Sequence, residues 1–222
     1  MIISDTEKFI FIHNPKCAGT TVRTTLSRYD SRNNFYWMYD RFNGMDIDKA
    51  HLPLHILEKY APSDFKLMDE YFVFGFVRHP LERFISSFNE MVPHIYQAYI
   101  RGQLPRAGYI DFVNQCANFI SADCVDGPKI HFRHFVRQLD MFYIHGAKKA
   151  DLILKVEDAA SAREALQPFS PLLADISPRW AARQNVKPTH LSWREILSPQ
   201  NQQRVRSLYA SDFEVFGYLD RE

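Results

Sequence analysis

Three short apolar runs constrain the fold of this chain more than any other feature, because each is followed directly by helix-compatible sequence. The runs span residues 9–12, 71–77 and 152–156 and are rich in β-branched and aromatic side chains. Continuous apolar runs of this length are typical of strands buried on both faces of a parallel sheet. Strands that alternate with helices form a layered domain with right-handed crossovers. The sequence therefore predicts an α/β fold, with a central parallel sheet flanked by helices in a single domain.

The first run ends in a turn that carries lysine, glycine and threonine. Residues 14–21 read NPKCAGTT, and helix-compatible sequence follows at 22–28. In such a strand–turn–helix unit, backbone N–H groups and the helix N-terminus present donors to an anion. The spacing differs from that of nucleoside triphosphate loops, because Thr20 occupies their lysine position and Lys16 lies four residues upstream. We therefore expect a P-loop-like turn for a phosphate donor other than ATP, bound by Lys16, Ala18, Gly19, Thr20 and Thr21.

The second run leads into a motif with a different phosphate-binding chemistry. Residues 78–88 read RHPLERFISSF, and Pro80 suits the first turn of a helix. Arg78 leaves the carboxyl end of the strand, while Ser86 lies two turns into that helix. A planar guanidinium and a hydroxyl at this place are suited to a second phosphate. Because ligands of such sheets bind at the carboxyl ends of the strands, both motifs predict one site at that edge.

These two motifs resemble those of sulfotransferases that use 3′-phosphoadenylyl sulfate (PAPS). The stretch PKCAGTT is similar to their 5′-phosphosulfate loop, and FVRHPLERFISSF to their 3′-phosphate segment. The likeness is greatest to the carbohydrate-type branch, which has bacterial members. It continues in order through residues 50–53, 151–158 and 209–218, and so covers nearly the whole chain. At His79 the chain departs from the family, which often has asparagine or aspartate there.

The resemblance implies a function and roles for single residues. The donor is PAPS, the acceptor a hydroxyl of a glycan, glycolipid or other molecule, and transfer is by in-line displacement. Lys16 stabilises the charge that grows on the bridging oxygen as the donor's bisphosphate leaves. Asn185, in the turn-like stretch 185–188, is assigned to the cofactor site with the residues of the two motifs. A catalytically inactive protein that binds nucleotide bisphosphates is the alternative, and the threonine at position 20 disfavours a nucleotide kinase.

A histidine that titrates near neutrality is suited to deprotonate the acceptor hydroxyl. The family's base lies between the two phosphate motifs, in a segment that resembles AHLP at residues 50–53, so His51 is our candidate. His55 is the alternative, and the two would share a helical face if Pro53 does not break the helix. Cys17 is expected to pack beneath the loop rather than to react.

Composition excludes several other classes of protein. The chain has 222 residues, of which 46% are apolar, and a net charge of +1, so no basic field favours nucleic acid. No apolar run is long enough to span a bilayer, and charges interrupt the N-terminus before a signal peptide could form. We therefore expect a cytoplasmic enzyme or a catalytic domain trimmed from a longer protein. The histidines and cysteines lack metal-ligand spacing, so no metal is expected.

The motifs also divide the single domain, residues 1–222, into two functional parts. The donor-binding core is expected at about 8–90 and 150–222, and the acceptor-side helices and loops at about 91–149. Aromatic and basic side chains in 91–149 suit an anionic or carbohydrate acceptor, or equally a packed helical segment with a charged surface. The sequence leaves the identity of the acceptor and the oligomeric state open.

Overall fold

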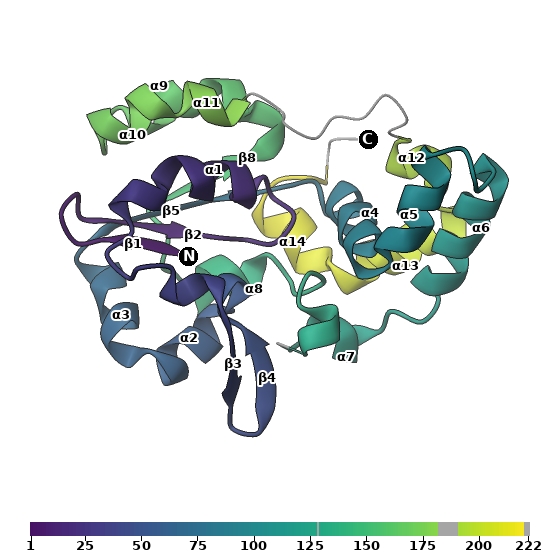
Figure 1. Cartoon of the computed structure of the whole chain (residues 1–222), viewed down its shortest axis with the longest axis horizontal. Coiled ribbons are helices and arrows are strands. Elements are labelled where there is room, and N and C mark those ends of the chain that lie inside the picture. The colour runs from purple at the N-terminus through teal and green to yellow at the C-terminus, as the bar shows by residue number, and fades with distance from the viewer. Residues whose placement is uncertain (128, 182–190, 220–222) are drawn as a thin grey trace.

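A four-stranded sheet forms the centre of the computed structural model, which describes residues 1–127, 129–181 and 191–219 (Figure 1). Its strands are β1 (Ile2–Ser4), β2 (Phe9–Ile12), β5 (Phe72–Val77) and β8 (Leu152–Lys155), in the order β1-β2-β5-β8. Strands β2, β5 and β8 are parallel, which confirms the three predicted runs as neighbouring strands. Ile12 pairs with Gly75 and Val77 with Lys155, so the carboxyl ends of these strands lie at one edge.

The sheet is mixed rather than purely parallel, which corrects the prediction. Strand β1 pairs antiparallel with β2, with Ile3 opposite Ile10. Only residues 5–8 join the two strands, and a connection that short can return the chain only in the antiparallel direction. Strand β1 is buried along its whole length, so it closes the edge of the sheet next to β2.

Helices cover both faces of the sheet. On one face the phenylalanines of β2 and β5 pack against α1 (Gly19–Leu26), α9 (Ala162–Leu166), α10 (Pro171–Ile176) and α11 (Pro178–Ala181). The opposite face, with Ile10, Ile12 and Val73, packs against α2 (Leu54–Tyr60), α3 (Pro62–Lys66) and α8 (Leu139–Phe142). Figure 1 shows these two groups of helices above and below the strands. The alternation of strand and helix along the chain thus gives an α/β layered domain, as predicted.

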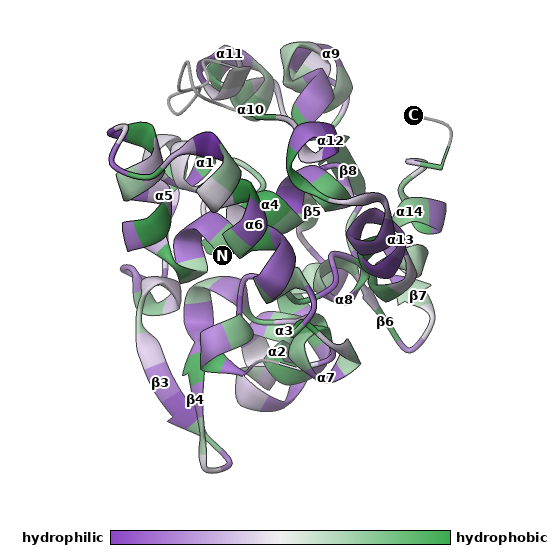
Figure 2. Cartoon of the chain, turned by 90° about the vertical axis from the view of Figure 1, so that its right-hand side faces the viewer, coloured by the Kyte–Doolittle hydropathy of each residue, from purple (hydrophilic) through white to green (hydrophobic). Residues whose placement is uncertain are grey.

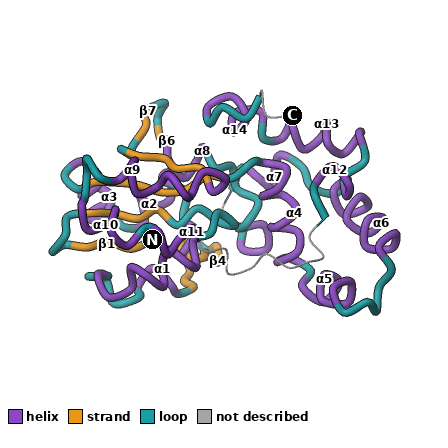
Figure 3. Tube along the Cα trace, turned by 90° about the horizontal axis from the view of Figure 1, so that it is seen from above, coloured by secondary structure: helices purple, strands orange, loops and turns teal. Residues whose placement is uncertain are grey.

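A second group of helices extends the domain beyond the carboxyl edge of the sheet. It comprises α4 (Pro80–Met91), α5 (Pro93–Ile100), α6 (Arg106–Ala117), α7 (Ala122–Val125), α12 (Trp193–Ile196), α13 (Pro199–Leu208) and α14 (Ala210–Val215). Figure 3 shows the strands in one half of the molecule and most of these helices in the other. Pro80 is at the first position of α4, and the Ser198 hydroxyl caps α13 by accepting from the Asn201 N–H, both as predicted.

Two antiparallel hairpins and several 3-10 turns complete the described structure. The hairpins pair β3 (Tyr39–Phe42) with β4 (Met45–Asp48), and β6 (Tyr143–Ile144) with β7 (Ala147–Lys148). Figure 2 shows the β3–β4 hairpin projecting from the body of the domain. The 3-10 turns are Ser27–Tyr29, Phe35–Trp37, Lys49–His51, Leu67–Asp69, Ile130–Phe132 and Val156–Ser161. Within the described ranges, none of the helices combines the length and apolar character needed to cross a bilayer.

Candidate functional site

The turn between β2 and α1 has the backbone shape of an anion site. Lys16 and Ala18 are both left-handed, at φ 63° and φ 59°, and α1 begins at Gly19. Left-handed residues before a helix turn successive N–H groups towards one concave surface, where the helix N-terminus adds further donors. Ala18 and Thr20 are exposed there. The Thr21 N–H donates instead to the Ala18 carbonyl, at 3.1 Å, so the hydroxyl is the group that Thr21 offers to a ligand.

Glycine at position 19 is required by the histidine beneath the turn. A Cβ on Gly19 would lie 1.8 Å from Cδ2 of His13, a distance that no side chain tolerates. The His13 ring is buried and stacks on Trp37, with ring centroids 5.6 Å apart. His13 therefore supports the turn from below, and only glycine lets the start of α1 approach it this closely.

Helix α4 brings the two predicted phosphate motifs together along one of its faces. Arg78, just before the helix, pairs with Glu82 at 3.4 Å, and Lys16 of the first turn pairs with Glu90 at 3.2 Å. Glu82, Ser86 and Glu90 follow one another at four-residue spacing, so they share that face. Glu82 and Glu90 are roughly 12 Å apart along the helix axis. The face thus places Arg78, Ser86 and Lys16 along one line, with Ser86 between the two basic side chains.

Gln138 joins these two turns from the protein interior, and no motif in the sequence predicts this role. Its side-chain oxygen accepts from the Arg78 N–H at 2.9 Å, from Nδ2 of Asn14 at 3.1 Å and from Sγ of Cys17 at 3.3 Å. Its side-chain amide donates to the Arg78 carbonyl at 2.9 Å. One fully buried amide therefore fixes the spacing between the first turn and the second.

Asp212 of α14 in turn holds Gln138 in place. Its carboxylate accepts from the backbone N–H groups of Gln138 and Leu139, at 3.0 and 2.9 Å. Burial raises the pKa of Asp212, while Arg83, 4.0 Å away, acts in the opposite direction. Two long-range partners therefore reach the site, one from segment 91–149 and one from the C-terminal helices. No local pattern in the sequence marks either of them.

His51 lies at the end of the 3-10 turn that follows β4, in a cluster of histidine rings. Its Nδ1 is 3.0 Å from the His13 carbonyl, and its ring meets those of His13 and His134 edge to face, at 4.5 and 5.2 Å. Burial lowers the pKa of His51 to about 4, below the neutral value expected from the sequence. Burial also lowers the pKa of His134, with smaller contributions from His51, Arg133 and the Lys16 ammonium. His134 thus lies near both His51 and Lys16.

Pro53 separates His51 from His55. The 3-10 turn ends at His51, Pro53 is at the N-cap position of the next helix, and His55 lies in the first turn of α2. The condition under which the two histidines would share a helical face is therefore not met. Burial and the nearby Lys59 lower the pKa of His55. His51, but not His55, belongs to the cluster of histidine rings described above.

Asp48, His51 and His134 also form a group that could hold a divalent metal ion. One ligand atom of each lies within 4.8 Å of the others. The Asp48 carboxylate already accepts from the Ala50 N–H at 2.9 Å and pairs with the Arg133 guanidinium at 3.1 Å. The positive charge of the Arg133 guanidinium opposes binding of a dication, because the guanidinium already pairs with Asp48, the anionic ligand of the group. The sequence-based expectation of no metal stays a prediction.

Three further residues drew attention in the sequence, namely Cys17, His79 and Asn185. Burial raises the pKa of the Cys17 thiol to about 12, so the side chain packs beneath the turn as a thiol. The His79 ring is enclosed by Trp193, Phe213 and Tyr218. The backbone N–H of His79 donates to Glu157 at 2.7 Å, which anchors the second turn to the segment after β8. Asn185 lies outside the described residues.

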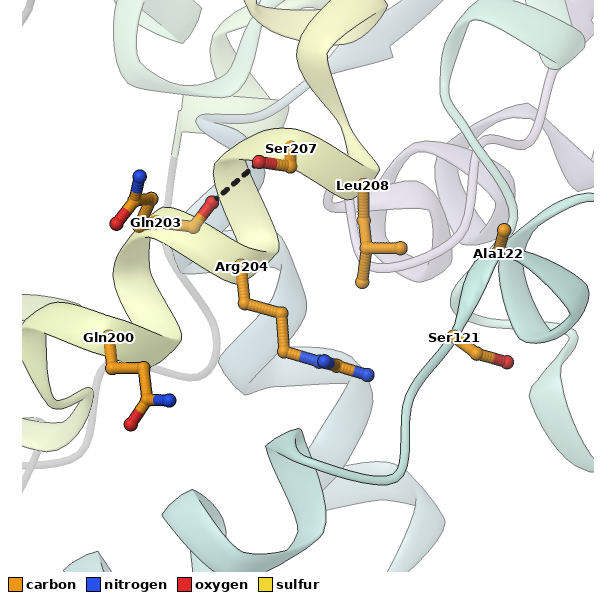
Figure 4. A pocket seen from close by; sticks show the side chains of 7 residues that line it. All are labelled: Ser121, Ala122, Gln200, Gln203, Arg204, Ser207 and Leu208. Carbon is orange, nitrogen blue, oxygen red and sulfur yellow. Dashed lines mark hydrogen bonds between the residues drawn. The ribbon is translucent and has the colours of Figure 1, made fainter.

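A groove elsewhere on the surface has a composition that does not suit catalysis. It has a volume of about 530 Å³ and lies between α7 and α13 (Figure 4). The Arg204 guanidinium there donates to the Ile120 carbonyl at 2.9 Å, and the Ser207 hydroxyl to the Gln203 carbonyl at 3.1 Å. The residues that line it include no histidine, cysteine or carboxylate: Ser121, Ala122, Gln200, Gln203, Arg204, Ser207 and Leu208. The candidate site is therefore the carboxyl edge of the sheet.

Comparison with known proteins agrees with the motifs at that edge. A family model described as "Sulfotransferase family" matches residues 1–219, almost the entire chain. No curated protein and no solved structure matches the chain. The family match covers the turns of both motifs, the histidine cluster, and the helices that carry Gln138 and Asp212.

Proposed function

We propose that this chain, which belongs to the sulfotransferase family, transfers a sulfuryl group from PAPS to a hydroxyl of an acceptor. The observation that carries the proposal is the alignment of Lys16, Ser86 and Arg78 along α4. A bisphosphate nucleotide needs cationic groups at two separated positions, and the two turns supply one each. The donor-binding edge is proposed to be P-loop-like, with residues 8–90 and 150–222 forming most of it.

The residues of the first turn are suited to hold the phosphosulfate end of PAPS. The N–H groups of Ala18, Gly19 and Thr20 and the hydroxyls of Thr20 and Thr21 are hydrogen-bond donors at the start of α1. Lys16 supplies positive charge beside them and exchanges its contact with Glu90 for the bridging oxygen. PAPS supplies the activated sulfuryl group. The charge on Lys16 acts most strongly as the bond to sulfur breaks, because negative charge then accumulates on the leaving oxygen.

The second turn is suited to hold the 3′-phosphate. Arg78 can exchange its partner Glu82 for a phosphate with little movement, because its backbone is fixed on both sides by Gln138. Ser86, one turn further along the same face than Glu82, adds a hydroxyl donor. Binding at this turn fixes the nucleotide while the first turn acts on its reacting end.

His51 is proposed as the base for the acceptor hydroxyl. When its Nδ1–H donates to the His13 carbonyl, Nε2 is the nitrogen that can accept a proton. Burial keeps the imidazole neutral at neutral pH, so that it can accept a proton, and a pKa of about 4 makes it a weaker base than a histidine that titrates near neutrality. The mechanism therefore assigns the proton to Nε2 of His51 and the leaving-group charge to Lys16.

Two measurements test this function in sequence. A thermal-shift comparison should show stabilisation by adenosine 3′,5′-bisphosphate and much less by ATP, because the threonine at position 20 replaces the lysine of a triphosphate loop. Incubation with labelled PAPS and a panel of glycans and metabolites should then transfer label to an acceptor. Stabilisation without transfer to any acceptor would favour the alternative, an inactive bisphosphate-binding module. Preferential stabilisation by ATP would exclude both.

A further inference from the structure

Asp48, His51 and His134 meet although they come from two distant segments of the chain. Asp48 is at the N-cap of the 3-10 turn Lys49–His51, and its side chain caps that turn. Residues three apart lie on the same side of a 3-10 turn, which brings the Asp48 carboxylate to the side of His51. His134 reaches them because the turn before it, Ile130–Phe132, packs beside β4. No local spacing in the sequence reveals this group.

Hydrogen bonds hold two of these side chains in place. The His134 carbonyl accepts from the Arg83 guanidinium at 3.0 Å and from the Ser87 hydroxyl at 2.7 Å. Nδ1 of His51 lies 3.0 Å from the His13 carbonyl. An imidazole that donates one ring N–H to a backbone carbonyl presents its other nitrogen in a fixed direction, and metal-binding histidines are commonly held in this way. The group is therefore partly organised before any ion binds.

The three side chains form a ligand set of the kind that zinc prefers. Zinc binds imidazole nitrogen and carboxylate oxygen at about 2.0–2.2 Å, and sites with three protein ligands keep a fourth position open. Ligand atoms of one ion therefore lie roughly 3–4 Å apart. One atom from each of Asp48, His51 and His134 lies within 4.8 Å of the others, so small side-chain rotations bring them to this spacing. All three residues are partly exposed, which gives an ion access from solvent.

Arg133 is the competitor of such an ion. Its Nε pairs with Asp48 at 3.1 Å, while another guanidinium nitrogen donates to the Ile130 carbonyl at 2.8 Å. Among the described residues this Nε–H has no hydrogen-bond partner, so its contact with Asp48 is ionic alone. Ion pairs that are partly exposed to solvent are weak, whereas a zinc ion would bind the carboxylate together with two imidazoles. Arg133 thus weakens zinc binding without preventing it.

We propose that Asp48, His51 and His134 bind a zinc ion, and that this ion inhibits sulfuryl transfer by occupying Nε2 of His51. A nitrogen that binds zinc has no lone pair left to take the proton of the acceptor hydroxyl. The ion is an inhibitor and not a cofactor, so transfer itself is expected to proceed without metal. Zinc binding is independent of the proposed sulfotransferase function, whereas the inhibitory effect rests on it.

Calorimetric titration of the full chain with Zn²⁺ tests the site directly. The wild type should bind one zinc ion at the group, and His134→Ala and Asp48→Asn should each weaken that binding about tenfold or more, because each removes one of three ligands. The two residues come from different segments, so a loss shared by both variants reports the site and not a local unfolding. Mg²⁺, which prefers oxygen ligands, should bind much more weakly.

Arg133→Gln removes the competing charge and should tighten zinc binding by about two- to fivefold. His145→Ala is the matched control, because His145 is an exposed histidine that also lies beside a carboxylate, that of Glu58, at 3.4 Å. It should leave zinc binding unchanged. The proposal is overturned if the wild type binds no zinc, if His134→Ala and Asp48→Asn bind zinc like the wild type, or if His145→Ala weakens binding as much as they do.

The effect on transfer is measured separately, with labelled PAPS. Zinc at concentrations that saturate the calorimetric site should stop transfer, a chelator should restore it, and Arg133→Gln should be inhibited at lower zinc concentrations. Transfer that continues while the site is saturated would overturn the inhibitory role. Absence of transfer in the zinc-free wild type would be a failure of the proposed function, and zinc binding that is lost in His134→Ala would support the site even then.

Discussion

The carboxyl edge of the sheet and the β3–β4 hairpin meet at His51, but they are held in opposite ways. At the edge, Asn14, Arg83, Gln138 and Asp212 are almost completely buried, and hydrogen bonds link Asn14 to Gln138 and Gln138 to Asp212. The hairpin exposes Met38, Tyr39 and Met45 and is fixed to the body mainly by its Ile47 face. A buried polar network fixes the spacing of the two turns, whereas an exposed hairpin tolerates substitution on its surface.

The difference predicts separable effects of substitution. Changes at the edge should alter donor binding, turnover or stability, since buried polar networks leave unsatisfied groups when they are cut. Changes at exposed positions of the hairpin should leave bisphosphate binding and stability nearly unchanged. His51 contacts both regions. Its Nδ1 is within hydrogen-bond distance of the His13 carbonyl, before the first turn, and its ring lies close to Asp48, at the end of the hairpin. Substitutions in each region test this separation.

Removing the proposed base should have the largest effect. His51→Ala should lower kcat by about two to four orders of magnitude, the range typical of general base catalysis, and leave bisphosphate affinity nearly intact. Because burial lowers the pKa of His51 to about 4, the wild-type kcat/KM should hold as pH falls through 6.5 and decline only near pH 4, where the imidazole is protonated. Steady-state kinetics across this pH range measures both.

His55→Ala is the control, because His55 is on α2, beyond Pro53, and should keep most of its activity. A fully active His51→Ala variant, or an inactive His55→Ala variant, would assign the base elsewhere.

Lys16→Ala should act on turnover more than on donor binding. The ammonium stabilises charge that appears only as the bond breaks, so kcat should fall by about two orders of magnitude. Lys66→Ala, an exposed lysine on α3, should have no such effect. If the donor KM rises while kcat stays at the wild-type value, Lys16 only binds the donor and the mechanism is wrong.

Gln138→Leu should reduce the stability of the edge. The substitution leaves the Arg78 N–H without its acceptor and the Arg78 carbonyl without its donor, at about 1–3 kcal/mol for each unsatisfied group. We expect the free energy of unfolding to fall by about 2–4 kcal/mol and bisphosphate affinity to fall with it. Urea unfolding measures the first quantity and calorimetry the second. Gln203→Leu, on the exposed side of α13, is the matched control, and an equal loss in both variants would show that Gln138 has no special role.

Glu90→Gln should produce the smallest change, and in the favourable direction. An exposed ion pair contributes up to about 1 kcal/mol, so releasing Lys16 from Glu90 should tighten bisphosphate binding by about two- to fivefold. Glu70→Gln removes an exposed carboxylate elsewhere and should leave affinity unchanged. Weaker binding by Glu90→Gln would show that Glu90 supports the donor site rather than competing for Lys16.

The sequence predicts the edge well where the signals are local. The runs at 9–12, 71–77 and 152–156 became neighbouring parallel strands, because continuous apolar character leaves few alternatives to burial on both faces. The turns that follow the first two runs therefore lie side by side at the carboxyl edge of the sheet. Pro80 and Ser198 marked helix starts for reasons of backbone geometry and capping, and both starts are observed.

Long-range contacts were beyond the sequence. Gln138 and Asp212 lie far along the chain from the two turns, and a single glutamine or aspartate has no periodicity that reveals its partners. The hairpin, in contrast, had a local signal that went unused. Asn43 and Gly44 adopt φ values of 50° and 78°, and an Asn-Gly pair between two possible strands favours this two-residue turn. Recognising the turn would have placed Tyr39 and Asp48 opposite each other.

The central claim is that the two turns hold opposite ends of one bisphosphate nucleotide, and calorimetry with Arg78→Ala tests it most directly. The wild type and the variant are titrated with adenosine 3′,5′-bisphosphate and with adenosine 5′-monophosphate. Loss of a charge-assisted contact should weaken the bisphosphate by about ten- to a hundredfold and leave the monophosphate nearly unchanged. Equal weakening of both ligands would contradict the claim, because Arg78 would then not distinguish a nucleotide that carries a 3′-phosphate from one that lacks it.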